Sequence, residues 1–155
     1  MINGWTILVH PLFLDQLESL TEEVEQLKLK KPESYGKKKA TKLLANINKL
    51  AFQVIPQDPT LSDYRQGDTL GKNYKHWFRG KFNQQYRLFF RFDSLSKIII
   101  YAWVNDGDTL RAYGSKTDAY KVFANMLDDG DPPDDWDQLL KKAAEEKERL
   151  KKSEK

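Results

Sequence analysis

Three short runs of aromatic and β-branched residues stand close together in the middle of the chain. They cover residues 77–82, 86–92 and 97–105, and polar breaks separate them. Runs of this kind, bounded by turn-forming residues, are typical of an antiparallel β-meander. Side-chain alternation then places basic residues on one face of the predicted sheet and mainly apolar residues on the other. The basic residues on the first two strands are Arg79, Lys81, Arg87 and Arg91.

The N-terminal part of the chain predicts one strand and two amphipathic helices. Residues 5–10 form a short apolar strand, which we expect at an edge of the sheet, and Pro11 can open the helix that follows. Apolar residues then recur at intervals of three and four up to Leu27, and again through residues 38–54. This period indicates helices that bury one face.

Two connections interrupt this part of the chain. Residues 28–39 contain Pro32, Gly36 and two short lysine runs. For these lysines a solvated interhelical loop is favoured over a nucleic-acid contact. Residues 55–75 hold two prolines and two glycines without a sustained period, which predicts a long irregular connection. Loops of that length in compact domains are often functional or mobile.

The region after the meander predicts further helices. Ser115 and Asp118 have the spacing of a capping box, and the helix that they open should run to Gly130. A last helix begins near Trp136 and becomes mostly charged, so its first half should pack on the body and its end should fray. We therefore expect an α+β fold, in which two N-terminal helices cover one face of an antiparallel sheet and C-terminal helices follow.

Length and composition fit one domain with a helical extension. The chain has 155 residues, 39% of them hydrophobic, and no cysteine. A core of ordinary size is therefore expected, while disulfides, zinc–thiolate sites and a cysteine nucleophile are excluded. The longest apolar run, residues 98–104, is too short to span a bilayer, and the first residues lack the pattern of a signal peptide. We expect a cytoplasmic protein without membrane partners, with a main domain at 1–130 and an extension at 131–155.

Positive charge is concentrated on and beside the predicted sheet. Residues 65–121 carry eleven basic and five acidic side chains, against a net charge of +3 for the whole chain. Arginines fixed on strands beside aromatic rings suit phosphates and unstacked bases. A solvated sheet face also carries cations, so this pattern alone favours a polyanionic partner without identifying it.

Several long motifs resemble the YhaV toxin family of the RelE/ParE superfamily. They read NGWTILVHP, ATKLL, YRLFFRF, AWVNDGDTLRAYGSKTDAY and PPDDW, and the resemblance runs from about residue 3 to residue 143. It implies a RelE-like fold and a toxin of a type II toxin–antitoxin system, an endoribonuclease that cuts mRNA on translating ribosomes and so inhibits translation and growth. The implied partner is a PrlF-type antitoxin, which is a swapped-hairpin DNA-binding protein. The toxin would reach operator DNA only through this antitoxin.

The resemblance also implies the chemistry and the catalytic residues. Cleavage would need no metal or other cofactor, because the ribose 2′-hydroxyl attacks its own 3′-phosphate and leaves a cyclic phosphate and a 5′-hydroxyl. The positions that match the working residues of RelE-type nucleases are Arg79, Lys81, Arg87, Arg111 and either Tyr113 or Tyr120. Because this chain inserts DGDTL before Arg111, the choice of tyrosine stays open.

These residue types suit the reaction. Attack by the 2′-oxygen builds negative charge on a phosphorane, which Arg87 and Arg111 could stabilise while Lys81 neutralises an oxygen. The general base is open among Lys81, His76, Tyr113 and Tyr120. Lysine and tyrosine have ordinary pKa values near 10 and would need neighbouring cations to lower them, whereas a histidine ordinarily titrates near neutral pH.

Further residues are candidates for binding RNA rather than for cleaving it. They are Lys75, His76, Trp77, Arg91 and Lys116, and Trp103 is a second ring that could stack on a base. The large aromatic residues are otherwise expected in the core.

Two other functions use the same pattern. Some superfamily members keep the fold but poison DNA gyrase without the basic catalytic set, and a basic sheet face could bind RNA without cutting it. The presence of Arg79, Lys81, Arg87 and Arg111 favours the nuclease. The helix at Trp136 could cover the core, contact a second copy or receive the antitoxin.

Overall fold

A four-stranded sheet forms the centre of the molecule in a computed structural model that describes residues 1–153. Strands β2 (Phe78–Phe82), β3 (Tyr86–Asp93) and β4 (Ile98–Val104) form the expected antiparallel meander. Strand β1 (Thr6–Val9) lies at the edge beyond β4 and runs parallel to it. The meander and the edge position of β1 are confirmed, and the parallel pairing of β1 makes the sheet mixed.

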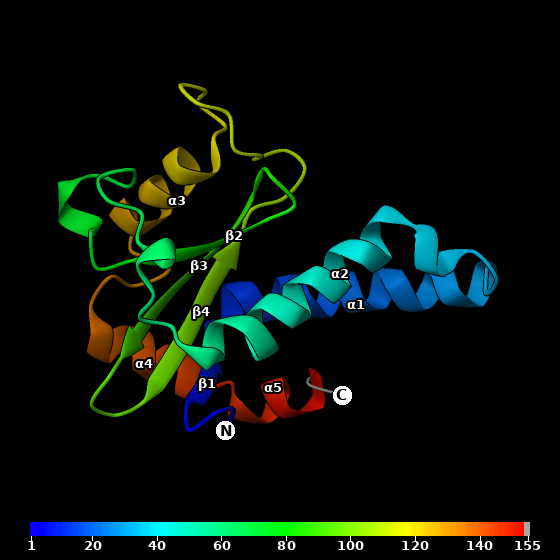
Figure 1. Cartoon of the computed structure of the whole chain (residues 1–155), viewed down its shortest axis with the longest axis horizontal. Coiled ribbons are helices and arrows are strands. Elements are labelled where there is room, and N and C mark those ends of the chain that lie inside the picture. The colour runs from blue at the N-terminus through cyan, green and yellow to red at the C-terminus, as the bar shows by residue number, and fades with distance from the viewer. Residues whose placement is uncertain (154–155) are drawn as a thin grey trace.

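The two N-terminal helices pack on one face of this sheet (Figure 1). Helix α1 (Pro11–Lys30) starts at a proline in its first turn, and α2 (Lys39–Lys49) continues into a π-helical turn at Leu50–Val54. Both helices bury an apolar stripe against alternate residues of the strands. The buried residues of this layer include Val9, Phe13, Leu17, Ile47, Leu88, Phe90 and Tyr101. Two helices on one face, as predicted, are confirmed.

The opposite face of the sheet is covered as well, by α3 (Ala119–Asp128) and α4 (Trp136–Ala144). This second layer includes Leu8, Trp77, Phe89, Trp103, Phe123 and Leu139. The rings of Phe89 and Phe123 stack with centroids 4.3 Å apart. The face that carries the strand arginines is therefore half apolar core and only partly open to solvent. Because Leu139 and Ala143 are buried, α4 has the first of the three roles considered for it, covering the core.

A β-bulge adjusts β4 to this second layer. Trp103 pairs with Phe89 and Tyr101 pairs with Phe90, so Ala102 has no partner on β3. An extra residue of this kind interrupts side-chain alternation. As a result Ala102 and Trp103 both face α3 and α4, while Tyr101 faces α1 and α2.

The C-terminal segment returns to the N-terminal helix. The single last helix that the pattern predicted is divided into α4 and α5 (Lys147–Ser153), and Leu150 of α5 is buried. Arg149 donates hydrogen bonds to Asp15 at 2.7 Å and to Glu18 at 2.5 Å, both on α1. The expected fraying is therefore wrong for the described part of α5, because an apolar anchor and an ion-pair network hold it.

The connection between α2 and β2 is irregular, as predicted. Its regular structure consists of short 3-10 turns at Ile55–Gln57, Ser62–Tyr64 and Lys72–Tyr74, and of an isolated β-bridge between Arg65 and Phe78. Across residues 1–153, none of the helices has the length and apolar character needed to cross a membrane.

Gly80 of β2 lies so close to the end of α2 that an added methyl group would press on the side chains of Leu50 and Ile55. A Cβ atom there would lie 2.9 Å from Leu50 Cδ2 and 3.1 Å from Ile55 Cδ1. Gly80→Ala is therefore expected to lower the free energy of unfolding by about 1–3 kcal/mol through overpacking. Gly107→Ala is the matched control, because a Cβ at Gly107 meets no atom within 4 Å. Urea unfolding of both variants measures the difference, and equal midpoints would contradict the prediction.

His10 closes the N-terminus of α1 from a buried position. Its Nδ1 accepts a hydrogen bond from the Leu12 N–H at 3.1 Å, and the side chain is 3% exposed. Burial lowers the pKa of His10 below its ordinary value of 6.5; Asp131, whose Oδ1 lies 3.6 Å from Nε2, opposes this effect, and Lys142 adds to it. The folded protein therefore favours the neutral imidazole, which the cap requires.

Acidification is expected to reduce stability through His10. Above about pH 6.5 the histidine is neutral in both the folded and the unfolded protein. Below about pH 6.5 the unfolded chain takes up the proton first, which lowers the free energy of unfolding. This loss of stability continues until the pH passes the lowered pKa of His10 in the folded state. Thermal unfolding between about pH 8 and about pH 5 should show a steeper decline for the wild type than for His10→Asn, whose side chain caps without titrating. Parallel profiles of the two proteins would argue against this role of His10.

Candidate active site

Three arginines from two strands and a loop meet at one tyrosine in the first turn of α3. Arg79 of β2 donates its Nε–H to Tyr120 Oη at 2.8 Å, and Arg87 of β3 donates its Nε–H to the same oxygen at 3.1 Å. The guanidinium carbon of Arg111 lies 4.8 Å from the centroid of the Tyr120 ring. We call Arg79, Arg87, Arg111 and Tyr120 the Tyr120 cluster.

Strand register and packing bring this cluster together. Arg79 pairs with Phe89 and Arg87 pairs with Lys81 across β2 and β3, so these side chains share one face of the sheet. The Tyr120 ring meets Phe89 edge-on, with centroids 5.5 Å apart, and Tyr120 is 4% exposed. Packing against the apolar residues under α3 therefore positions the Tyr120 hydroxyl relative to the strands.

Arg79 and Arg87 are buried cations without a carboxylate partner. Their exposed fractions are 8% and 7%. Arg79 donates to the carbonyl of Asp63 at 2.7 Å, and Arg87 donates to the carbonyls of Gln84 and Tyr86 at 2.8 and 2.9 Å. No ion pair with an acidic side chain in residues 1–153 involves either arginine. Since burying an uncompensated charge is unfavourable, this pair is suited to attract an anion.

Arg111 is held by a buried carboxylate that also starts α3. Asp118 Oδ1 accepts hydrogen bonds from Arg111 at 2.5 Å and from the Ala112 N–H at 2.7 Å, while Oδ2 accepts from the Tyr120 N–H at 3.1 Å. Asp118 is thus the N-cap, and the prediction of Ser115 as the cap is wrong. Ser115 instead accepts from the Thr117 N–H in the turn before the helix.

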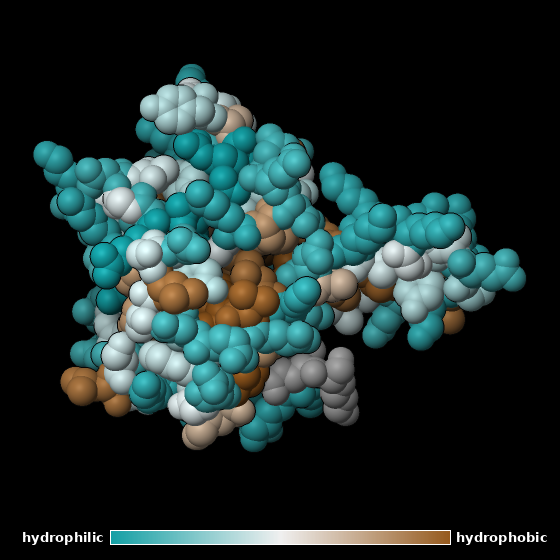
Figure 2. Space-filling model, in the orientation of Figure 1, coloured by the Kyte–Doolittle hydropathy of each residue, from teal (hydrophilic) through white to brown (hydrophobic). Residues whose placement is uncertain are grey.

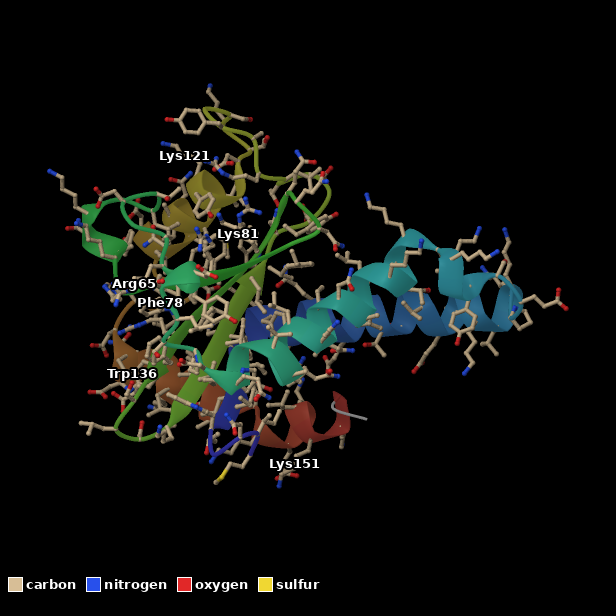
Figure 3. All side chains as sticks on the ribbon, in the orientation of Figure 1. Arg65, Phe78, Lys81, Lys121, Trp136 and Lys151 are labelled. Atoms are coloured by element: carbon tan, nitrogen blue, oxygen red, sulfur yellow. The ribbon has the colours of Figure 1, made fainter. Side chains whose placement is uncertain are left out.

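A cavity of about 770 Å³ opens beside the Tyr120 cluster. Arg111 and Tyr120 line its floor, and Tyr113, Lys116 and Lys121 line it from the loop before α3 and from α3 itself. Lys81 at the end of β2 and Lys121 on α3 lie at the same end of the molecule (Figure 3). The cavity is large enough for part of a nucleotide, and its lining combines three cations, Arg111, Lys116 and Lys121, with two acids, Asp68 and Asp118.

The opposite wall of this cavity, residues 68–71, is fixed in place by its own hydrogen bonds. Buried Gln66 accepts from the Leu70 N–H at 3.0 Å and donates to the carbonyl of Tyr74 at 2.8 Å. Tyr74 donates its hydroxyl to Asp128 of α3 at 2.5 Å, and this bond raises the pKa of Tyr74 to about 12. Tyr74 therefore keeps the hydroxyl proton that ties this wall to α3.

The remaining predicted catalytic residues lie at the margin of the cluster. Lys81 is exposed and stands opposite Arg87 in the strand register. Tyr113 is 94% exposed, and its ring lies 5.3 Å from the Arg111 guanidinium carbon. Of the residues expected to bind RNA, Lys116 is exposed on the cavity rim, and Lys75 forms an ion pair with Asp68 at 3.1 Å.

His76, Trp77 and Arg91 form a separate group around Asp134. The Asp134 carboxylate bonds to His76 Nε2 at 2.5 Å and to Trp77 Nε1 at 2.8 Å, and its carbonyl accepts from Arg91 at 2.5 Å. Arg91 lies between the rings of Trp77 and Trp136. The group fastens the segment before α4 to the sheet. Trp77 is 0% exposed, so burial leaves its ring no surface for the base contact that we expected.

Comparison with known proteins decides the family. A family model described as a toxin with endonuclease activity, of a toxin–antitoxin system, matches residues 7–144. The chain belongs to the YhaV toxin family. It is 48% identical over 147 residues to the ribonuclease toxin YhaV of Escherichia coli strain K12 and to the toxin YhaV of Escherichia coli O157:H7, and each match covers 93% of this chain and 95% of the relative. No solved structure gives a significant match.

Membership in the YhaV family settles the general activity. The chain is an endonuclease toxin of a toxin–antitoxin system, and an antitoxin is its partner. The resemblance seen in the motifs is confirmed, and so is the α+β class of the fold. The RelE-like arrangement stays a prediction.

Four residues that shape the site of this YhaV-family toxin, or the neighbouring group around Asp134, are not singled out as site residues by their sequence positions. Asn105 is 2% exposed; its Oδ1 accepts from the Arg87 N–H at 2.6 Å, and its Nδ2 donates to the carbonyls of Gln85 and Thr109. Asp118, Lys121 and Asp134 are the other three. For Asp118 the Ser-Lys-Thr-Asp spacing is an available signal, whereas Asn105 bonds to Arg87 and Asp134 bonds to His76 and Trp77, which lie far from them in sequence. No group of three or more histidines and acids that could hold a metal ion occurs in the described part of the chain.

Proposed function

We propose that this toxin cleaves RNA at the Tyr120 cluster, without a metal ion, by attack of a ribose 2′-hydroxyl on the adjacent phosphate. The observation that carries the proposal is the pair of buried guanidiniums, Arg79 and Arg87, which share one phenol and have no carboxylate partner in residues 1–153. The name of the relative from strain K12, a ribonuclease toxin, supports RNA as the substrate.

The arginines supply the electrostatic part of the reaction. The 2′-oxygen forms a bond to phosphorus, the bond from phosphorus to the 5′-oxygen breaks, and negative charge grows on the phosphoryl oxygens in between. Arg79 and Arg87 meet at the Tyr120 oxygen, and Arg111 lies over the ring of the same tyrosine while Asp118 holds it, so all three are ordered before the phosphate arrives. Preordered donors of this kind stabilise the transition state more than the ground state.

Tyr120 is the tyrosine that the geometry favours. Its oxygen already accepts two N–H bonds, from Arg79 and Arg87, so its remaining capacity is the O–H proton. We assign that proton to the departing 5′-oxygen. Tyr113 is exposed on the loop and contacts the cluster only through Arg111.

Lys81 is the base that we propose for the 2′-hydroxyl. It is exposed at the end of β2, directly opposite Arg87, and in its unprotonated form it can take the 2′-hydroxyl proton. His76, the other candidate, is bound to Asp134 in the separate group beside α4.

The biological setting follows from the same proposal. The substrate is mRNA on translating ribosomes, and its cleavage in the cytoplasm inhibits translation and growth. A PrlF-type, swapped-hairpin antitoxin restrains the toxin, and operator DNA is bound only through that antitoxin. The motifs shared with the YhaV family support this setting.

Mapping of the cleaved ends tests the proposal. Purified toxin is incubated with mRNA on translating ribosomes in magnesium buffer, and at high concentration with the same mRNA free of ribosomes in EDTA, because EDTA dissociates ribosomes. New ends are located by primer extension. We expect 5′-hydroxyl and 2′,3′-cyclic phosphate ends, abundant on ribosomes and sparse on free mRNA, with the sparse cleavage unaffected by EDTA. Ends with a 5′-phosphate, or cleavage of free mRNA that EDTA abolishes, would overturn the mechanism. If the wild type cuts nothing, gyrase inhibition or RNA binding without cleavage becomes the better account.

A further inference from the structure

The α1–α2 hairpin projects from the body as an arm (Figure 1). The last residue of α1 that is buried in the core is Leu17, and the helix continues to Lys30. At 1.5 Å per residue the end of α1 lies about 20 Å beyond Leu17. The end of the arm, residues 28–42, comprises the last turn of α1, a 3-10 turn and the start of α2. We call this segment the lysine tip.

The lysine tip carries a dense positive charge that is not neutralised. Its fifteen residues include seven lysines and a single acid, Glu33. All these lysines except the half-buried Lys38 are exposed, and the surface over the arm is largely hydrophilic (Figure 2). The ion pairs that lysines make within residues 1–153 involve Lys75 and Lys151, neither of which belongs to the tip.

Helix stability does not account for these lysines. Lys28 and Lys30 lie in the last turn of α1, where cations are favourable. Lys37, Lys38 and Lys39 lie at the N-terminus of α2, where the helix dipole disfavours cations, and α2 has no side-chain cap and no acid in its first turn. The lysines at the start of α2 therefore reduce the stability of the helix, and a partner with negative charge would explain their presence.

We propose that the lysine tip binds the phosphate backbone of RNA outside the segment that is cut, as a second contact separate from the Tyr120 cluster. The inference rests on the proposed RNA cleavage. Lysines on flexible stems bind phosphates without reading sequence, and each contact releases counterions. An interface with a protein would need an apolar or aromatic centre, whereas the tip exposes few apolar side chains, chiefly Leu29.

Two charge-matched variants test the tip. The tip variant and the control variant each lose four exposed lysines, so their net charges are equal. The tip substitutions at Lys37 and Lys39 remove cations from the N-terminus of α2, where the helix dipole disfavours them, so these changes should not unfold the helix. Neither set includes a residue of the Tyr120 cluster. The tip variant is Lys31→Gln, Lys37→Gln, Lys39→Gln and Lys42→Gln; the control variant is Lys141→Gln, Lys142→Gln, Lys147→Gln and Lys152→Gln.

Binding to a long RNA and to ribosomes is measured by fluorescence anisotropy and by co-sedimentation over a series of salt concentrations. We expect the tip variant to bind about tenfold more weakly at low salt and to show a shallower salt dependence than the wild type, with the control variant close to the wild type. In cleavage assays the maximal rate should be unchanged and the half-saturating concentration raised. Binding by the tip variant that equals that of the control variant would overturn the proposal.

Two further outcomes separate this inference from others. If the tip variant binds RNA normally but no longer co-purifies with the antitoxin, the partner of the tip is a protein and the proposal is overturned. If the wild type cuts no RNA, the proposed function fails, but the binding measurement still decides whether the tip contacts RNA.

Discussion

Replacing Arg87 by alanine is expected to lower the single-turnover rate of RNA cleavage at least about 1,000-fold and to abolish growth arrest. Arg87 is the residue through which β3 reaches the Tyr120 cluster, and it is 7% exposed without a carboxylate partner in the described residues. Its loss removes a preordered donor from the phosphate and leaves Tyr120 with one arginine bond. Quenched-flow cleavage assays and colony counts after induction provide the measurement.

Two control variants make this result specific. Arg87→Lys keeps the charge but cannot bond at once to Tyr120 and to the carbonyls of Gln84 and Tyr86, so activity should stay well below that of the wild type. Arg65→Ala removes an exposed arginine from the neighbouring loop and should leave cleavage near the wild-type rate. Circular dichroism and thermal unfolding show whether the fold is kept. Undiminished growth arrest by a folded Arg87→Ala protein would sink the assignment of this arginine.

The two candidate tyrosines are expected to respond in opposite ways to removal of the hydroxyl. Tyr120→Phe should reduce cleavage about 100-fold or more, because it deletes the proton proposed for the departing oxygen. It should also lower the free energy of unfolding by about 1–3 kcal/mol, since the Nε–H groups of Arg79 and Arg87 lose their shared acceptor.

Tyr113→Phe is the matched variant. The Tyr113 ring is 94% exposed, and its hydroxyl makes no hydrogen bond within the described chain. Both cleavage and stability should therefore stay close to those of the wild type. A large loss of cleavage in Tyr113→Phe, with Tyr120→Phe unaffected, would reverse the assignment of the two tyrosines.

The sequence pattern predicted most of the helices and strands, but it did not predict how they are layered. Alternation along β2 and β3 correctly placed Arg79 and Arg87 on one face, because a period of two is imposed by the pleat itself. The pattern could not show that Phe123 and Leu139 cover that same face, since an apolar helical stripe does not say which surface it meets. Nor could it locate the bulge at Ala102, which depends on the fit of Trp103 to α3.

The candidate site was predictable where it depends on the two neighbouring strands β2 and β3. The meeting of Arg79 and Arg87 follows from register, whereas the position of Tyr120 relative to Tyr113 depends on a loop whose path is fixed by Asn105 and Asp118. The resemblance to the YhaV family named these residues without deciding between the tyrosines. The sequence could not show that His76, Trp77 and Arg91 bond to Asp134, because Asp134 lies more than forty residues further along the chain.

The parallel pairing of β1 with β4 sets the order in which the molecule can fold. Thr6 has its partner at Ile98, so the first strand made at the ribosome must wait until nearly two thirds of the chain is available. Contacts this distant in sequence slow folding, because the intervening chain must be ordered before they form. Tyr120 and Asp118 come later still, on a helix that needs the completed sheet to pack against. A nascent toxin therefore lacks an assembled Tyr120 cluster until synthesis is well advanced.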